Sequence, residues 1–188
     1  SNELKFRDGT TFLPKKGIKD LKPLVKSPDS GKLKIIYIVH EDDKDIAQQL
    51  AKYLKNGLTH DRAYFGGLKD YVSLVFGHDK ERNIVFTNSE NPLVDIEQRL
   101  NQINFPDEKY FAIYLSPISR FDPNETKREV YYKVKDMLLK RDIPSQVIDK
   151  EKMVAKGDKY VFSLYNIAVA ILAKLNGIPW RLDTPSKN

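Results

Sequence analysis

Residues 163–180 constrain the fold of this chain more than any other stretch. They read Ser-Leu-Tyr-Asn-Ile-Ala-Val-Ala-Ile-Leu-Ala-Lys-Leu-Asn-Gly-Ile-Pro-Trp, a string that predicts a helix with apolar residues on nearly every face. Such a helix is usually buried in a protein core. Asn176 and Gly177 can end the helix, and Pro179 prevents it from continuing.

A single cation, Lys174, lies near the last turn of this predicted helix. A buried ammonium group destabilises the fold unless a negative charge faces it. That charge belongs either to a carboxylate of the protein or to an anionic ligand. Alternatively, Lys174 reaches from the end of the helix into solvent, where the helix dipole also favours a cation.

The composition is that of one folded domain, with 188 residues of which 40% are hydrophobic and 31% are charged. The absence of cysteine excludes disulfides and thiolate sites and fits a reducing, cytoplasmic location. No apolar run approaches the roughly 18 residues of a membrane span, and no signal peptide is visible, so we expect no membrane partner. The net charge of +6 favours acidic partners, nucleic acid first.

Strand and helix patterns alternate along the chain after residue 31. The spacing of apolar residues predicts strands at 34–39, 83–87, 110–115 and 145–148, and helices at 42–56, 92–103 and 125–141. Residues 71–76 fit a strand or a helix. This alternation predicts an α/β fold with a Rossmann-like, mainly parallel sheet flanked by helices on both faces. Ligands of such sheets bind beyond the carboxyl ends of the strands, near helix starts.

Residues 1–31 are rich in glycine and proline, which indicates a loop-like linker that lies on the domain, with one short strand near residues 4–6. The domain itself is expected at 32–182, followed by a tail at 183–188. The basic residues between 15 and 26 would be solvated or would contact a nucleic-acid backbone.

The loop after strand 110–115 leads into the helix at 125–141. Asp122 or Thr126 could cap this helix, and we favour Thr126 because it leaves a longer loop. Tyr131 and Lys135 are four residues apart and therefore share one helix face. An aromatic ring beside a cation suits a nucleotide, although a tyrosine on such a helix also suits the rim of a core.

Gln146 stands where this helix gives way to the next strand. Its amide can donate a hydrogen bond to a phosphate oxygen. A solvated glutamine at a strand end is the ordinary alternative.

Tyr131, Lys135, Gln146 and Lys174, in this order and spacing, resemble the pocket for the guide 5′-phosphate in the MID domains of Argonaute proteins. The neighbouring strings Tyr-Tyr-Lys-Val-Lys and Ile-Pro-Ser-Gln are similar as well. The apolar string that ends at Trp180 resembles the end of a prokaryotic Argonaute MID domain, and residues 4–23 resemble the preceding linker. Residues 40–108 add only a compatible α/β pattern.

The resemblance implies a nucleic-acid-binding module that anchors the 5′-phosphorylated end of a single-stranded guide, either RNA or DNA. Tyr131 would stack on the first base, while Lys135 and Lys174 would hold the terminal phosphate and Gln146 would hydrogen-bond it. Because a terminal phosphate carries up to two charges, two lysines would distinguish a strand end from its middle. Arg120, in the loop 117–124, would face the edge of the first base.

Three details qualify the resemblance. Ala170 occupies a place where many family members have a polar or basic residue, so one phosphate contact is missing. Asn176 and Gly177 occupy the place where members of the family usually have two glycines. Tyr132 competes with Tyr131 for the stacking role, and we prefer Tyr131 because it precedes Lys135 by four residues.

In Argonautes, the carboxylates that cleave the target belong to the PIWI domain, which follows this point. We therefore expect a module that is not an enzyme, that needs no cofactor, and whose partners are the guide and the PIWI domain of the same parent chain. In several family members, a PIWI carboxylate and a divalent ion complete the phosphate site.

A different function would centre on His40, Glu41, Asp42 and Asp43, which follow a predicted strand. These residues would suit a metal site or a nucleotide-using transferase or hydrolase. An acidic helix start is the simpler account, because the helix dipole favours it. His60 and His78 have no partners at the spacing of metal ligands.

Overall fold

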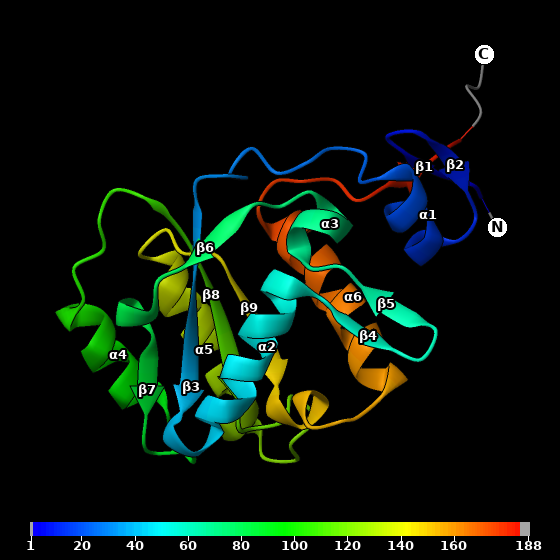
Figure 1. Ribbon diagram of the computed structural model, residues 1–188. Coiled ribbons are helices and arrows are strands. Elements are labelled where there is room, and N and C mark those ends of the chain that lie inside the picture. The colour runs from blue at the N-terminus through cyan, green and yellow to red at the C-terminus, as the bar shows by residue number, and fades with distance from the viewer. Residues whose placement is uncertain (1, 185–188) are drawn as a thin grey trace.

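The computed structural model describes residues 2–184 and contains a parallel sheet between two layers of helices (Figure 1). The order in the sheet is β6-β3-β8-β9, and β7 pairs with β3 as well. These strands are β3 (Leu33–His40), β6 (Phe76–His78), β7 (Ile84–Phe86), β8 (Lys109–Ser116) and β9 (Ser145–Asp149). Every pairing in this sheet is parallel, which confirms the predicted fold class.

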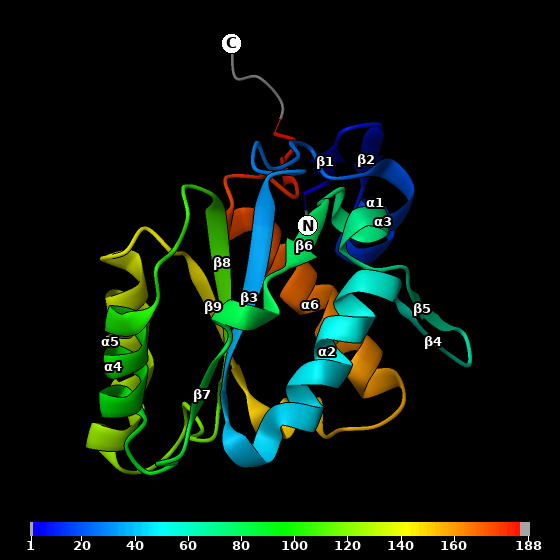
Figure 2. The same cartoon turned by 60° about the vertical axis from the view of Figure 1, so that its left-hand side comes forward.

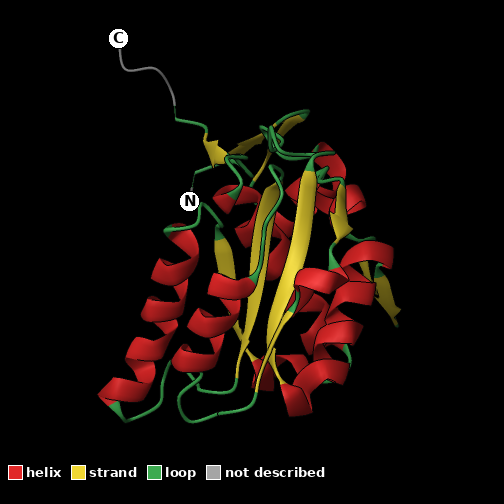
Figure 3. Ribbon diagram, turned by 90° about the vertical axis from the view of Figure 1, so that its left-hand side faces the viewer, coloured by secondary structure: helices red, strands yellow, loops and turns green. Residues whose placement is uncertain are grey.

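Helices cover both faces of the sheet (Figures 2 and 3). On one face lie α2 (Lys44–Asn56), α3 (Leu68–Val72) and α6 (Asp158–Lys174); on the other lie α4 (Leu93–Gln102) and α5 (Glu125–Leu139). Alternation along β3 explains this arrangement, since Ile35 and Tyr37 point into the first layer and Ile36 and Ile38 into the second. A strand buried on both faces reads as a continuous apolar run.

The chain order places β9 at one edge of the sheet and β6 and β7 at the other. From β3 the chain moves outward to β6 and β7, then crosses back to form β8 and β9 on the opposite side of β3. Three single-turn helices, η1 (Glu41–Asp43), η2 (Lys80–Arg82) and η3 (Lys150–Met153), lie near strand ends. The edge at β9, between α5 and α6, holds the residues of the candidate site.

The first 31 residues are more ordered than their composition indicates. They form β1 (Leu4–Phe6), β2 (Gly9–Thr11) and helix α1 (Pro14–Leu21), and β1 pairs with β10 (Arg181–Leu182). The expected strand at 4–6 is confirmed, the expectation of loop is wrong for β2 and α1, and residues 22–31 have no helix or strand, as expected.

Two residues account for the missed helix α1. Pro14 occupies the first helical turn, where its missing N–H leaves no hydrogen bond unmade. Gly17 lies directly against the ring of Phe6, where a β-carbon would overlap that ring. Proline and glycine usually break helices, but here Pro14 begins α1 and Gly17 lets the helix pack against Phe6. The division into a linker at 1–31, a domain at 32–182 and a tail stays a prediction, and residues 185–188 of the tail lie outside the described part of the chain.

Residues 71–76, for which the sequence left helix and strand open, begin in a helix and end in a strand. Helix α3 includes Tyr71 and Val72 and ends at Ser73, which adopts a left-handed conformation with φ of 59°. Strand β6 begins only at Phe76. A second small hairpin, β4 (Leu58–His60) and β5 (Ala63–Phe65), was not expected from the sequence.

Helix α6 ends where the sequence predicts. Asn176 is left-handed with φ of 65°, and the Gly177 N–H donates to the carbonyl of Leu172, as in a standard helix end. The helix is nevertheless not buried all round, because Phe162 is 45% exposed and Ala173 is exposed too. The expectation of complete burial is wrong for this stripe. Within residues 2–184, no helix combines the length and apolarity needed to cross a bilayer.

Candidate functional site

A cavity of about 300 Å³ lies along β9, between α5 and α6. Four of the lining residues come from three different elements: Tyr131 from α5, Gln146 from β9, and Asn166 and Ala170 from α6. Arg120 reaches it from the loop before α5. Three of the five predicted site residues, Arg120, Tyr131 and Gln146, therefore line one cavity.

Lys174 is the last residue of α6 and is half-buried beside the start of β9. Its Nζ donates to the Ser145 carbonyl at 2.9 Å and to the Gln146 side-chain oxygen at 2.6 Å. Both acceptors are uncharged. The ammonium group is thus fixed next to Gln146 by neutral oxygens rather than by an acid.

Lys135 lies on α5, one turn after Tyr131, although neither it nor Lys174 is among the residues that line the cavity. Burial, followed by the positive charge of Lys135, lowers the pKa of Lys174 below its ordinary value. The ion pairs within residues 2–184 include neither lysine. The charge of Lys135 thus disfavours the charged form of Lys174, neither lysine has an ion-pair partner in this part of the chain, and an anion at this place would stabilise both ammonium groups.

Tyr131 and Tyr132 differ sharply in their surroundings. Tyr131 is half-buried and lines the cavity, whereas Tyr132 is 64% exposed. Their rings meet edge to face with centroids 5.0 Å apart. Of the two rings, that of Tyr131 lines the cavity, and its stacking role stays a prediction.

The start of α5 differs from both sequence-based alternatives. Asn124 is the capping residue, and its Oδ1 accepts from the backbone N–H of Lys127 at 3.2 Å. Asp122 instead accepts from the N–H of Asn124 at 2.8 Å, within the loop. The prediction of Thr126 as the cap is wrong, because asparagine is as good a cap and lies two residues earlier.

Several cavity residues were missed in the sequence. Asn166, Ala170 and Lys174 are spaced four apart on α6 and so share a face, a signal that would have identified Asn166. Asp149 at the end of β9 and Lys152 in η3 also line the cavity. No spacing rule connects these two residues to α5, since only the tertiary fold brings them together.

The cluster at 40–43 does not assemble a metal site. His40 Nδ1 accepts from the N–H of Asp42 at 3.1 Å, and its Nε2 donates to the Thr87 carbonyl at 2.9 Å. Both ring nitrogens are thus used in holding the chain at η1. Asp43 is buried with its Oδ1 at 3.5 Å from Nζ of Lys150. These contacts support the simpler account, an acidic helix start.

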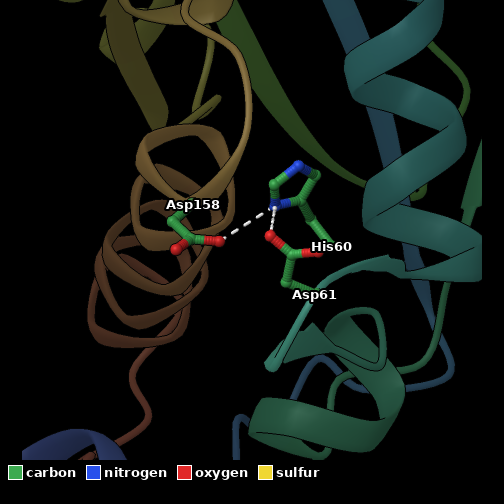
Figure 4. Close-up of side chains that lie close together, drawn as sticks. All are labelled: His60, Asp61 and Asp158. Atoms are coloured by element: carbon green, nitrogen blue, oxygen red, sulfur yellow. Dashed lines mark hydrogen bonds and ion pairs between the residues drawn. The ribbon is translucent and has the colours of Figure 1, made fainter.

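His60 does have acidic neighbours, contrary to the expectation from sequence spacing (Figure 4). Its Nδ1 lies 3.0 Å from Oδ1 of Asp158 and 3.7 Å from Oδ2 of Asp61. The hydrogen bond to Asp158 is the main cause that raises the pKa of His60. All three residues are exposed, so an ordinary surface ion pair at the start of α6 accounts for the contact.

No protein-family model and no curated protein matches this sequence. Solved structures do match its fold. The Clostridium butyricum Argonaute bound to a guide DNA and a 19-mer target DNA has a TM-score of 0.69 and 18% identity, over 100% of this chain and 25% of that chain. Drosophila Piwi has a TM-score of 0.68 and 14% identity, over 98% of this chain and 23% of that chain. The chain thus has an Argonaute-related fold and spans about a quarter of the length of these proteins.

Proposed function

We propose that this chain is a nucleic-acid-binding module of the MID type, which anchors the 5′-phosphorylated end of a guide strand. The observation that carries the proposal is the half-buried ammonium group of Lys174, which contacts Gln146 and the Ser145 carbonyl and has no ion-pair partner in residues 2–184. The guide is a single strand of RNA or DNA. The second proposed partner is a PIWI domain of the same parent protein.

The chemistry of the site suits a strand terminus. Two ammonium groups match the two negative charges of a terminal phosphate, while an internal phosphate offers only one. Lys174 already holds the oxygen of the Gln146 side chain at 2.6 Å. This contact orients the amide, whose nitrogen donates one hydrogen to the Val147 carbonyl at 3.2 Å and keeps its second for a phosphate oxygen.

Tyr131 supplies the stacking surface in this proposal. Its ring lines the same cavity as Gln146, so a phosphate beside Gln146 leaves the first base near the ring. Stacking of a base on an aromatic side chain contributes about 1–3 kcal/mol and accepts every base. Arg120, on the same cavity, is proposed to meet the edge of that base.

The comparison with solved structures supports the proposal through the shared fold. The Clostridium butyricum Argonaute, whose fold this chain shares over its whole length, was solved with a guide DNA. The assignment of roles to Tyr131, Lys135, Gln146 and Lys174 depends on the geometry of this chain. No catalytic step and no cofactor is included in the proposal. Asp149 is the one carboxylate among the described lining residues. A single carboxylate does not provide enough oxygen ligands for a divalent ion.

The test compares two short oligonucleotides that differ only in a 5′-phosphate or a 5′-hydroxyl. We expect the phosphorylated strand to bind at least about tenfold more tightly, because charge-assisted hydrogen bonds contribute roughly 1.5–3 kcal/mol. Lys135→Ala and Lys174→Ala should each reduce this ratio toward one. Lys133→Ala removes a charge from the same helix and should leave the ratio unchanged.

Equal binding of the two strands by the unchanged protein would refute the proposal. Equal losses in Lys133→Ala and Lys174→Ala would also refute it, because general attraction to a polyanion would then explain the binding.

The alternative function, a nucleotide-using transferase or hydrolase centred on 40–43, gains no support from the geometry. Both ring nitrogens of His40 already have partners, and Asp43 is buried near Lys150. We therefore propose no catalytic role for this cluster.

A further inference from the structure

A second cavity opens at the opposite edge of the sheet from β9, between α2 and the strands β6 and β7. Its volume is about 390 Å³, which falls within the range of small-molecule sites. It results from a break in the sheet edge. Strand β6 pairs with β3 up to Ile35, and β7 pairs with β3 only from Ile38.

Between these two pairings, the chain leaves the sheet as η2. The backbone N–H of Tyr37 therefore lacks a strand partner on this edge and donates instead to Oδ1 of Asn83 at 2.8 Å. The side-chain nitrogen of Asn83 remains as a donor. The break thus produces a defined hollow lined by side chains rather than an irregular loop surface.

The polar lining of this hollow has one chemical character. Every polar side chain in it carries a hydrogen-bond donor, and that of Tyr37 is used within the wall by His78; the others are Lys44, Gln48, His78, Lys80 and Asn83. The lining contains no carboxylate. Valine and alanine side chains from β3, α2 and β7 form the rest of the wall. A wall of donors beside a small apolar surface selects for an anion with a compact apolar part.

His78 adds a fixed donor to this wall. Its Nε2 lies 3.0 Å from the hydroxyl oxygen of Tyr37. Tyr37 as a whole is only 4% exposed. Burial, followed by the charges of Lys55 and Lys80, lowers the pKa of His78 to about 4, so the ring is neutral at pH 7. Burial raises the pKa of Tyr37, so its hydroxyl keeps its proton and donates it to Nε2. The ring proton of His78 is then on Nδ1.

The charges around the hollow are strongly unbalanced. Lys44 and Lys80 take part in none of the ion pairs found in the described part of the chain. An adjoining hollow shares His78 and Lys80 and adds Lys52 and Lys55, against one carboxylate, Asp45. The linings of the two hollows together thus contain four lysines and one carboxylate.

We propose that this cavity binds a phosphate group, either as free phosphate or as a small phosphate ester whose apolar part contacts the valine and alanine wall. Lys44 and Lys80 supply the charge, and Asn83 and His78 supply neutral donors. The site is separate from the cavity at β9, since the two lie at opposite edges of the sheet.

The test uses the histidine signals in nuclear magnetic resonance spectra, because the chain has only three histidines. Inorganic phosphate, phenyl phosphate and phenol are titrated at constant ionic strength. We expect the His78 signals to shift saturably with both phosphates and not with phenol, while the exposed His60 serves as the reference. Tighter binding of phenyl phosphate would identify an ester as the ligand, and equal binding would identify free phosphate.

Variants separate this site from the proposed guide site. Lys80→Ala should weaken the response of His78 roughly tenfold, the loss expected for one charge-assisted contact. Lys174→Ala and the control Lys133→Ala should leave it unchanged. A His78 signal that moves no more than that of His60, a response unaffected by Lys80→Ala, or one lost in Lys174→Ala would each overturn the proposal.

Discussion

At the scale of single residues, the ammonium group of Lys174 distinguishes the candidate site from an ordinary helix end. A lysine at a helix C-terminus usually extends into solvent. Here the side chain turns toward β9 and is held by two neutral oxygens. Burial, followed by the charge of Lys135, lowers its pKa below the ordinary value of a lysine. Lys174 has no ion-pair partner among the described residues, and this supports the proposal that an anion binds beside it.

An anion bound at this place should raise the pKa of Lys174. A negative charge between the two lysines reverses the effect of Lys135 and stabilises both ammonium forms. Nuclear magnetic resonance of the lysine side chains, with and without a nucleoside 5′-monophosphate, measures this shift. Lys133 provides the internal control. An unchanged pKa of Lys174 at saturating ligand would place the phosphate elsewhere.

The contact between His60 and Asp158 predicts a pH dependence of stability. The pKa of His60 is raised in the folded protein, so its stabilising contribution is fully present below the unfolded value of about 6.5. It is lost as the pH rises through the raised pKa. Thermal unfolding of the wild type and His60→Gln should therefore differ at pH 5.5 and converge in mildly alkaline solution. A difference that grows with pH would contradict this assignment.

At the scale of secondary-structure elements, Asn124 determines where α5 begins and therefore how Tyr131 and Lys135 are presented. Its side chain satisfies one of the free N–H groups of the first turn. The loop before it remains long enough for Arg120 to reach the cavity.

Asn124→Ala should lower the free energy of unfolding by about 1 kcal/mol, the usual effect of losing a helix cap. Thr126→Ala is the matched control and should change it by much less, because Thr126 does not cap the helix. Urea denaturation measures both. A larger loss in Thr126→Ala would show that the helix begins at the later residue.

Helix α1 depends on the absence of a side chain at Gly17. A β-carbon there would overlap the ring of Phe6. Gly17→Ala should therefore destabilise the protein by about 2 kcal/mol, in the range found for overpacked cores. Adding Phe6→Leu to Gly17→Ala should recover part of that loss, since the smaller side chain leaves room. A double variant with simply additive losses would contradict the contact.

At the scale of the whole molecule, the sequence predicts the central strands and the long helices that cover them. It does not predict several of the short elements at the periphery of the fold. The apolar runs in β3 and β8 and the amphipathic spacing of α2, α4 and α5 are local signals, so these elements follow from periodicity. Helix α1 depends on the contact of Gly17 with Phe6, and the break between β6 and β7 is bridged by the hydrogen bond from Tyr37 to Asn83. These contacts join different elements, so the periodicity of one segment does not reveal them.

The same distinction applies to the site. Tyr131 and Lys135 share a helix face, which the sequence shows directly. Asp149 and Lys152 reach the cavity only through the position of β9 and η3, which no spacing rule contains.

The most direct test of the guide-anchoring proposal is a crystal structure of the protein with a nucleoside 5′-monophosphate. The account predicts a phosphate with oxygens about 2.7–2.9 Å from Nζ of both Lys135 and Lys174, the distance of charge-assisted hydrogen bonds. The base should lie against Tyr131. A phosphate bound away from the two lysines, or lysines that remain without an anion at saturating ligand, would contradict the account.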